Sequence, residues 1–163
     1  MKSLVLYATR HGNTQLVANT IGIALERYGS VEVTPLAEAP ERLDCDLLVV
    51  GGPTEGHGPT PEVEHYLKAL DPHALRGLMA AAFDTRLKWP RFISGSAAGT
   101  IAQRLDAAGA EVLWPPGSFL VTMEPRLRLG ELARASDWAL DIGERAAGTV
   151  ARRHAVRPVG SAA

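Results

Sequence analysis

Short apolar segments alternate with helical patterns along this chain, and this alternation limits the possible folds more than any other feature of the sequence. The strand-like segments are 3–8, 31–34, 46–50, 78–83 and a fifth in two halves, 112–114 and 119–121. Apolar segments separated by helices are typical of β-α-β units, whose strands form a parallel sheet. The sequence therefore predicts an α/β domain in which helices cover both faces of a five-stranded parallel sheet.

The helices are predicted from apolar residues that recur at helical spacing. These segments are 13–28, 98–109 and 130–147. A further helix is expected to begin at Pro61, because Thr60 is a favourable cap and proline is well tolerated at the first helical position.

Length and composition favour one domain. The chain has 163 residues, of which 46% are apolar, and this is enough for a sizeable core. The domain is expected to span 1–150, with Trp114 and Trp138 in its core. Residues 151–163 contain three arginines and no acidic residue, so a disordered tail is expected there.

Charge and cysteine usage exclude several classes of function. The formal net charge is −1, which gives no electrostatic case for binding nucleic acid or an anionic membrane. The single cysteine, Cys45, rules out an internal disulfide and a thiolate metal cluster, and the histidines lack metal-ligand spacing. The apolar stretch near the N-terminus is too short for a signal sequence, so a cytoplasmic location is expected.

The segment 8–14, Ala-Thr-Arg-His-Gly-Asn-Thr, joins the first predicted strand to the first predicted helix. A short turn at this place leaves the first main-chain N–H groups of the helix without partners in the chain. These donors, together with the positive end of the helix dipole, attract an anion. Thr9, Thr14 and Asn13 add side-chain donors. A phosphate group is therefore the expected ligand, as part of a nucleotide or a flavin.

Two further loops are expected to meet this segment. In doubly wound parallel sheets, ligands bind outside the carboxyl ends of the strands. The loops predicted at this edge are 9–14, 51–59 and 84–94. They contain the residues whose presence is least readily explained by packing in the core or on a helix face. The agreement among the three loops supports a ligand site there.

These loops resemble those of the flavodoxins. Residues 9–14, Thr-Arg-His-Gly-Asn-Thr, resemble the family's phosphate loop, T/S-x-T-G-N-T, and 52–56 lie where flavodoxins have their second loop. Residues 83–95 have the length and place of the third loop. Other segments, 94–98 among them, resemble a bacterial branch of flavodoxin-domain proteins. The resemblance covers about residues 1–147.

The resemblance implies a flavodoxin-like three-layer α/β/α fold with strand order 2-1-3-4-5 and one noncovalently bound FMN. The phosphate would lie against the first loop, and Thr54 would lie near the ribityl chain and the ring, which the third loop would enclose. The expected cofactor contacts are Thr9, Arg10, His11, Gly12, Asn13, Thr14, Pro53, Thr54, Glu55, Gly56, Asp84, Thr85, Arg86, Trp89 and Phe92.

The chain also departs from the family pattern. His11 replaces the usual hydroxyl residue, and Arg10 adds a positive charge beside the phosphate site. Glu55 stands where an aromatic residue commonly stacks on the ring, which removes a contact worth roughly 1 kcal/mol. Trp89 or Phe92 is available for stacking instead. These departures predict weaker binding of FMN than in a typical flavodoxin.

The third loop is also unusual in its charge. It holds Arg86, Lys88 and Arg91 against Asp84, whereas flavodoxins that shuttle electrons are typically strongly acidic. Positive charge at this place would stabilise an anionic reduced flavin or attract an anionic partner.

Three functions are compatible with these residues. The main hypothesis is an FMN-binding electron carrier that serves a redox partner protein or a small-molecule acceptor. It requires no catalytic acid or base. Glu55 and His57 are a candidate acid–base pair and His11 is a candidate general acid, but nothing else in the loops completes a catalytic constellation. The alternatives are an FMN-dependent NAD(P)H:quinone-type oxidoreductase, whose second site would lie at an oligomer interface, and a flavodoxin-fold module without flavin that acts in regulation or binding.

Overall fold

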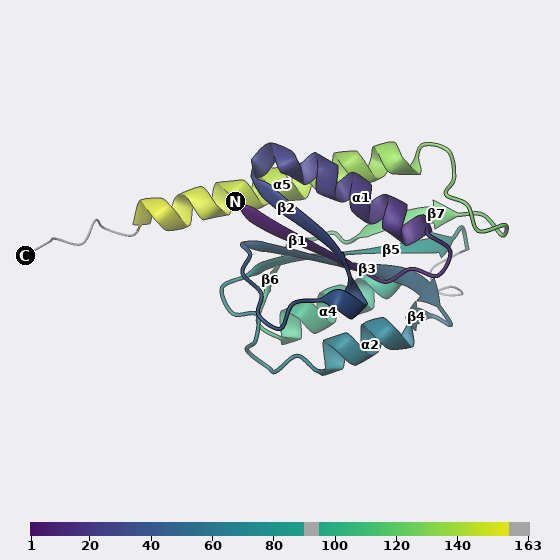
Figure 1. The fold of residues 1–163 in the computed structure, drawn as a ribbon, viewed down its shortest axis with the longest axis horizontal. Coiled ribbons are helices and arrows are strands. Elements are labelled where there is room, and N and C mark those ends of the chain that lie inside the picture. The colour runs from purple at the N-terminus through teal and green to yellow at the C-terminus, as the bar shows by residue number, and fades with distance from the viewer. Residues whose placement is uncertain (90–94, 157–163) are drawn as a thin grey trace, which may run out of the picture.

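The computed structural model describes residues 1–89 and 95–156. A sheet occupies the middle of the molecule (Figure 1). Its strands are β1 (Lys2–Tyr7), β2 (Ser30–Pro35), β3 (Leu47–Glu55), β5 (Met79–Leu87), β6 (Glu111–Val112) and β7 (Gly117–Val121). They follow the order β2-β1-β3-β5-β6, with β7 also paired to β5, and all these pairings are parallel. A short β4 (Gly58–Pro59) folds back antiparallel on β3.

The fifth position of the sheet is filled by two short strands. β6 pairs with the first residues of β5, and β7 pairs with its last residues from Phe83 to Leu87. Pro115 and Pro116 lie between the two halves and have no N–H to contribute to a ladder. The predicted interruption is therefore confirmed, and so is the strand order 2-1-3-4-5, with β6 and β7 together as the fifth strand.

Two helical layers enclose the sheet (Figure 1). The helices α1 (Asn13–Leu25) and α5 (Glu131–Val156) cover one face, whereas α2 (Pro61–Lys68) and α4 (Ala97–Ala107) cover the other. The short 3-10 turn η1 (Glu26–Tyr28) follows the end of α1, and a second one, η2 (Leu36–Glu38), follows β2. The three-layer α/β/α fold is confirmed.

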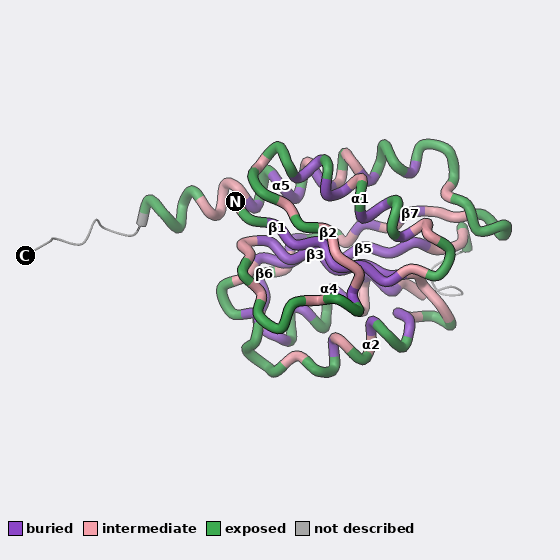
Figure 2. Tube along the Cα trace, viewed as in Figure 1, coloured by how far each residue is buried: buried purple, intermediate pink, exposed green. Residues whose placement is uncertain are grey.

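Alternating side chains of the central strands build a core on each face of the sheet. On β1, Val5 packs towards α1 and α5, whereas Leu4 and Leu6 pack towards α2 and α4. The central strands are buried along most of their length (Figure 2). Both faces are apolar because both are covered by helices, as is typical of parallel sheets.

The strands β3 and β5 extend further than predicted. They reach Glu55 and Leu87, so parts of the predicted loops 51–59 and 84–94 belong to the sheet. These extensions pair with each other, Gly52 opposite Asp84. Their glycine, proline and polar side chains carry no apolar pattern, and the ladder between neighbouring strands decides their conformation. Residues 90–94 lie outside the described part of the chain.

The last helix also continues beyond its predicted end. It runs to Val156 rather than to residue 147, and Arg153 anchors this part of it. The Arg153 guanidinium donates to the carbonyl oxygen of Gly77 (2.7 Å) and to a carboxylate oxygen of Glu111 (3.0 Å). Residues 151–156 are therefore helical, and 157–163 lie outside the described residues. The domain boundary at 150 stays a prediction.

One of the two tryptophans predicted to lie in the core does not. Trp114 is 46% exposed, in the segment between β6 and β7 where the fifth strand is interrupted. Trp138 is half-buried against Phe119. Among the described helices, none has the length and apolar character needed to cross a bilayer.

Candidate functional site

A cavity of about 240 Å³ opens at the carboxyl edge of the sheet. The segment after β1, the last residues of β3 and β5, and the end of β7 with the segment that follows it meet there. The cavity brings most of the predicted cofactor contacts together. The predicted residues that line it are Thr9, Arg10, His11, Asn13, Thr14, Pro53, Thr54, Glu55, Thr85 and Arg86.

Five lining residues were not predicted. These are Leu87, Val121, Thr122, Met123 and Pro125, at the ends of β5 and β7 and in the β7–α5 segment. The strand order is the signal that points to them, because it places the end of the fifth strand beside the end of β5. Their side chains alone do not distinguish them from an ordinary loop.

The start of α1 faces this cavity without a side-chain cap. Gly12 is the N-cap residue, with a φ of 81°, a left-handed conformation that favours glycine. Its N–H donates to the Thr9 hydroxyl at 3.0 Å. The main-chain N–H groups of Arg10, His11 and residues 13–15 have no acceptor among the described residues. The helix start therefore keeps several donors and its positive dipole end for an anion.

Two hydroxyl groups join the first helix to the sheet beneath the cavity. The hydroxyls of Thr14 and Thr85 lie 2.8 Å apart, and Thr14 is only 1% exposed. The pair shares one hydrogen bond, so one hydroxyl hydrogen remains to be donated. This bond fixes the position of the α1 start relative to the end of β5.

An ion pair joins the first loop to the end of β3. Arg10 Nε lies 2.5 Å from Glu55 Oε1, and both side chains line the cavity. They are 56% and 38% exposed, so water screens the pair. Glu55 occupies the place expected for a stacking aromatic residue and instead brings a negative charge to the cavity.

Asn13 connects the first loop to the β7–α5 segment. Its side-chain Nδ2 donates to the carbonyl oxygen of Pro125 at 2.8 Å. The side-chain amide, predicted as a donor to phosphate, is therefore engaged within the protein, whereas the main-chain N–H of Asn13 is not.

Asp84 lies beneath the cavity and does not line it. Its carboxylate is fully buried and accepts hydrogen bonds from four groups. The donors are Ser118 Oγ (2.6 Å), Thr54 Oγ1, Ser96 Oγ and Ala98 N (3.0 Å each). Burial of a charged group requires such compensation. The Asp84 carboxylate thus joins β3, β5, β7 and the start of α4, and the expected contact of Asp84 with a cofactor stays a prediction.

The Thr54 hydroxyl is used by the same network. It donates to Asp84 and accepts from the main-chain N–H of Ala97 at 2.9 Å. Thr54 lines the cavity, but its hydroxyl hydrogen is not available to a ribityl chain in this structure.

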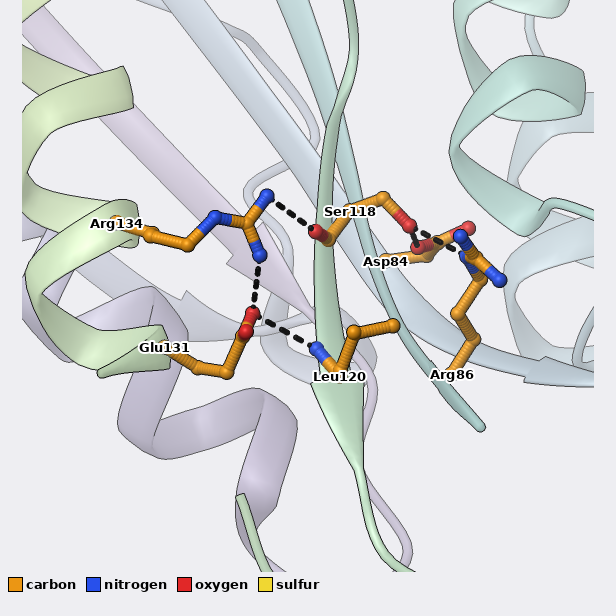
Figure 3. A network of polar contacts seen from close by, with 6 residues as sticks. All are labelled: Asp84, Arg86, Ser118, Leu120, Glu131 and Arg134. Carbon is orange, nitrogen blue, oxygen red and sulfur yellow. Dashed lines mark hydrogen bonds and ion pairs between the residues drawn. The ribbon is translucent and has the colours of Figure 1, made fainter. Parts of the chain in front are cut away.

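β7 is held from both sides by polar side chains (Figure 3). On one side, Arg86 Nε donates to the Ser118 hydroxyl at 2.8 Å. On the other, the carboxylate of Glu131 accepts from the main-chain N–H of Leu120 (2.9 Å) and from Arg134 (2.6 Å). Two outer main-chain groups of β7, the N–H of Leu120 and the carbonyl oxygen of Ser118, are thus bonded to side chains of α5, which holds the cavity wall that β7 supplies.

Among the described residues, three further predicted contacts are not part of the cavity lining: Gly12, Gly56 and Trp89. Gly12 shapes the turn, and Gly56 is exposed at the β3–β4 turn. Trp89 is 50% exposed and does not line the cavity, whereas Phe92 lies outside the described residues. Among the described residues, the cavity lining thus contains no Phe, Tyr or Trp ring.

The structure is similar to those of flavodoxins. A flavodoxin from the domain Archaea is 23% identical, with a TM-score of 0.74 over 90% of this chain and 99% of its own. Oxidised flavodoxin 2 from Bacillus cereus is 25% identical, with a TM-score of 0.74 over 89% of this chain and 99% of its own. No family model and no curated protein matches the sequence.

The same fold is found within larger proteins. The rubredoxin oxygen:oxidoreductase from Desulfovibrio gigas is 17% identical, with a TM-score of 0.73 over 92% of this chain but only 37% of its own. The chain therefore has the flavodoxin fold. The resemblance to flavodoxins inferred from the loop at 9–14 is confirmed.

Proposed function

We propose that this protein binds FMN in the cavity at the start of α1 and acts as an electron carrier. The observation that carries this proposal is the uncapped helix start, whose free N–H groups open into a cavity at the carboxyl edge of a flavodoxin-fold sheet. The flavodoxins that share the fold support FMN as the ligand.

The donors at the start of α1 suit a phosphate dianion. The main-chain N–H groups of residues 13–15 and of His11 supply hydrogen bonds without any change in the fold. The Thr9 hydroxyl accepts from Gly12 and so keeps its own hydrogen for a ligand. Arg10 adds a positive charge, although Glu55 neutralises part of it.

The apolar residues of the cavity lining suit the less polar portion of the cofactor. Pro53, Leu87, Val121 and Met123 supply apolar lining. FMN supplies the redox chemistry when bound, and the protein residues orient it and set its electrostatic surroundings. An electron carrier needs no catalytic acid or base.

A second candidate is a flavodoxin-fold module that does not retain flavin. The Arg10–Glu55 pair and the Asn13–Pro125 hydrogen bond favour it, because both engage polar groups that a phosphate would otherwise meet. The reductase alternative has no specific observation in its favour, and the redox partner and the cytoplasmic location stay predictions.

A flavin titration separates these functions. FMN fluorescence is followed as purified protein is added, and the bound flavin is then reduced with dithionite under anaerobic conditions. Saturable quenching and reoxidation by an added electron acceptor support the carrier. An absence of quenching supports the module without flavin. Rapid oxidation of NAD(P)H with a quinone, without any added reductase, contradicts a pure carrier.

A further inference from the structure

A second hollow adjoins the cavity on the surface of the β7–α5 segment. It is lined by residues 122–124 and 126–129, and two of them, Thr122 and Met123, also line the cavity. The two hollows together form one continuous surface, which we call the rim surface. A molecule that docks on this surface lies next to whatever the cavity holds.

Main-chain hydrogen bonds hold this segment in place. The N–H of Thr122 donates to the carbonyl oxygen of Arg126, and the N–H of Arg128 donates to that of Leu120, both at 2.9 Å. Val121 also forms a β-bridge with Leu127. The segment folds back on the outer edge of β7, so its exposed side chains stand on a preformed support, which lowers the cost of ordering them on binding.

The rim surface concentrates positive charge. Four arginines line it, Arg10, Arg86, Arg126 and Arg128, against the two glutamates Glu55 and Glu124. The whole chain has a formal net charge of −1, so the rest of the molecule is acidic by comparison.

Two of these arginines are available to a partner. Arg10 pairs with Glu55, and Arg86 binds protein groups. The side chains of Arg126 and Arg128 have no hydrogen bond or ion pair with any residue that the structure describes, and both residues are exposed.

Exposed apolar side chains lie between these charges. Met123 is 75% exposed and Leu129 is fully exposed. Arginine and methionine are enriched in protein–protein interfaces, and exposed apolar groups rimmed by charge are typical of docking sites. The composition therefore favours a protein partner over a small ion.

We infer that the rim surface docks a redox partner protein that presents carboxylates around an apolar centre. This inference rests on the proposed function, because it requires a cofactor in the adjoining cavity. The step is the transfer of one electron from the reduced cofactor, which is thereby oxidised, to the partner's acceptor, which is reduced, and no covalent bond forms. Arg126 and Arg128 attract the partner's carboxylates, and Met123 and Leu129 contact its apolar centre.

The test compares two haem proteins of opposite charge as electron acceptors. The FMN-loaded protein is reduced anaerobically and mixed in a stopped-flow instrument with cytochrome b5, which is acidic, or with cytochrome c, which is basic. At about 10 mM salt, R126E/R128E is expected to slow reduction of cytochrome b5 by about tenfold and not to slow reduction of cytochrome c. At about 500 mM salt the difference between variant and wild type should disappear.

The variant R27E/R42E is a matched control. It changes the net charge equally, at exposed positions close to the amino ends of the strands. It should leave both rates within about twofold of the wild type. Equal slowing by the two double variants, or a rate with cytochrome b5 that does not depend on salt, would overturn the inference while the proposed function stands.

Two further outcomes are decisive. If the wild type binds no FMN, the proposed function fails, and the inference that rests on it fails too. If the protein sediments with phosphatidylserine vesicles and R126E/R128E does not, the rim surface is a membrane-binding surface, and the inference of a protein partner is wrong.

Discussion

Arg10 Nε and Glu55 Oε1 lie 2.5 Å apart in the wall of the cavity, next to the free N–H groups at the start of α1. Exposed ion pairs contribute only about 0–1 kcal/mol to stability. The effect of this pair therefore falls mainly on the ligand. A phosphate dianion in the cavity is attracted by Arg10 and repelled by Glu55, so the two side chains set its affinity in opposite directions.

Replacement of Glu55 by glutamine should tighten FMN binding. The variant Glu55→Gln removes a negative charge beside the phosphate site and releases Arg10 from its partner. We expect the dissociation constant for FMN to fall about tenfold at low salt, which corresponds to about 1.4 kcal/mol. Fluorescence quenching measures it. Riboflavin, which lacks the phosphate, is the control, and an equal gain for riboflavin would show that Glu55 does not act on the phosphate.

Asp84 should be essential for the stability of the cavity floor. In Asp84→Asn, an NH₂ group that cannot accept a hydrogen bond replaces one carboxylate oxygen. The four groups that donate to this carboxylate then lose part of their acceptor. The free energy of unfolding in urea should fall by about 2 kcal/mol. Asp137→Asn, on an exposed position of α5, is the control and should change stability by less than about 0.5 kcal/mol. Equal losses in the two variants would contradict the role of Asp84.

His57 occupies a conformation that few side chains adopt. Its φ is 79°, directly after Gly56 at the β3–β4 turn. His57→Gly relieves this strain and should raise the free energy of unfolding by about 0.5 kcal/mol, whereas the β-branched side chain of His57→Val should lower it by about 1 kcal/mol. Urea unfolding of the two variants checks this order. The reverse order would mean that side-chain contacts of His57 outweigh its backbone strain.

Cys45 should react slowly with alkylating agents. Burial, with smaller effects from Asp46 and Asp44, raises the pKa of the Cys45 thiol from 9.0 to about 11. At pH 8 the thiolate fraction, and with it the rate of alkylation by iodoacetamide, should be about 100-fold lower than in the unfolded chain. Mass spectrometry with and without urea measures the two rates. Equal rates would show that the thiol is not shielded.

The same pKa shift predicts a change of stability at high pH. The Cys45 thiol has a higher pKa in the folded protein than in the unfolded chain. Once the unfolded chain loses this proton, the free energy of unfolding decreases as the pH rises. The contribution is present below pH 9 and is lost between pH 9 and about 11, as the unfolded thiol releases its proton before the folded one. Cys45→Ser should remove this part of the pH dependence.

The residue pattern was sufficient to predict the layers and the first loop, whereas the strand order came from the resemblance to flavodoxins. Apolar residues such as Val5 and Val49 are buried on a covered sheet face, and this requirement leaves a pattern in the sequence. The turn at Gly12 also leaves one, because a left-handed residue at a helix start favours glycine.

Other features depend on contacts between distant parts of the chain. Asp84 looks like a loop carboxylate in sequence, and only the approach of Ser118, Ser96 and Thr54 makes it a buried acceptor. Met123 lines the cavity because the β7–α5 segment folds back on β7. Neither of these long-range contacts leaves a recognisable pattern in the nearby sequence.

The central claim is that the main-chain N–H groups at the start of α1 bind the phosphate of FMN, and amide NMR tests it most directly. In the ¹⁵N-labelled protein, the amide signals of His11, Asn13 and Thr14 should shift strongly when FMN is added and much less when riboflavin is added. Bound FMN that leaves these three signals in place, or that shifts them no more than riboflavin does, would contradict the account.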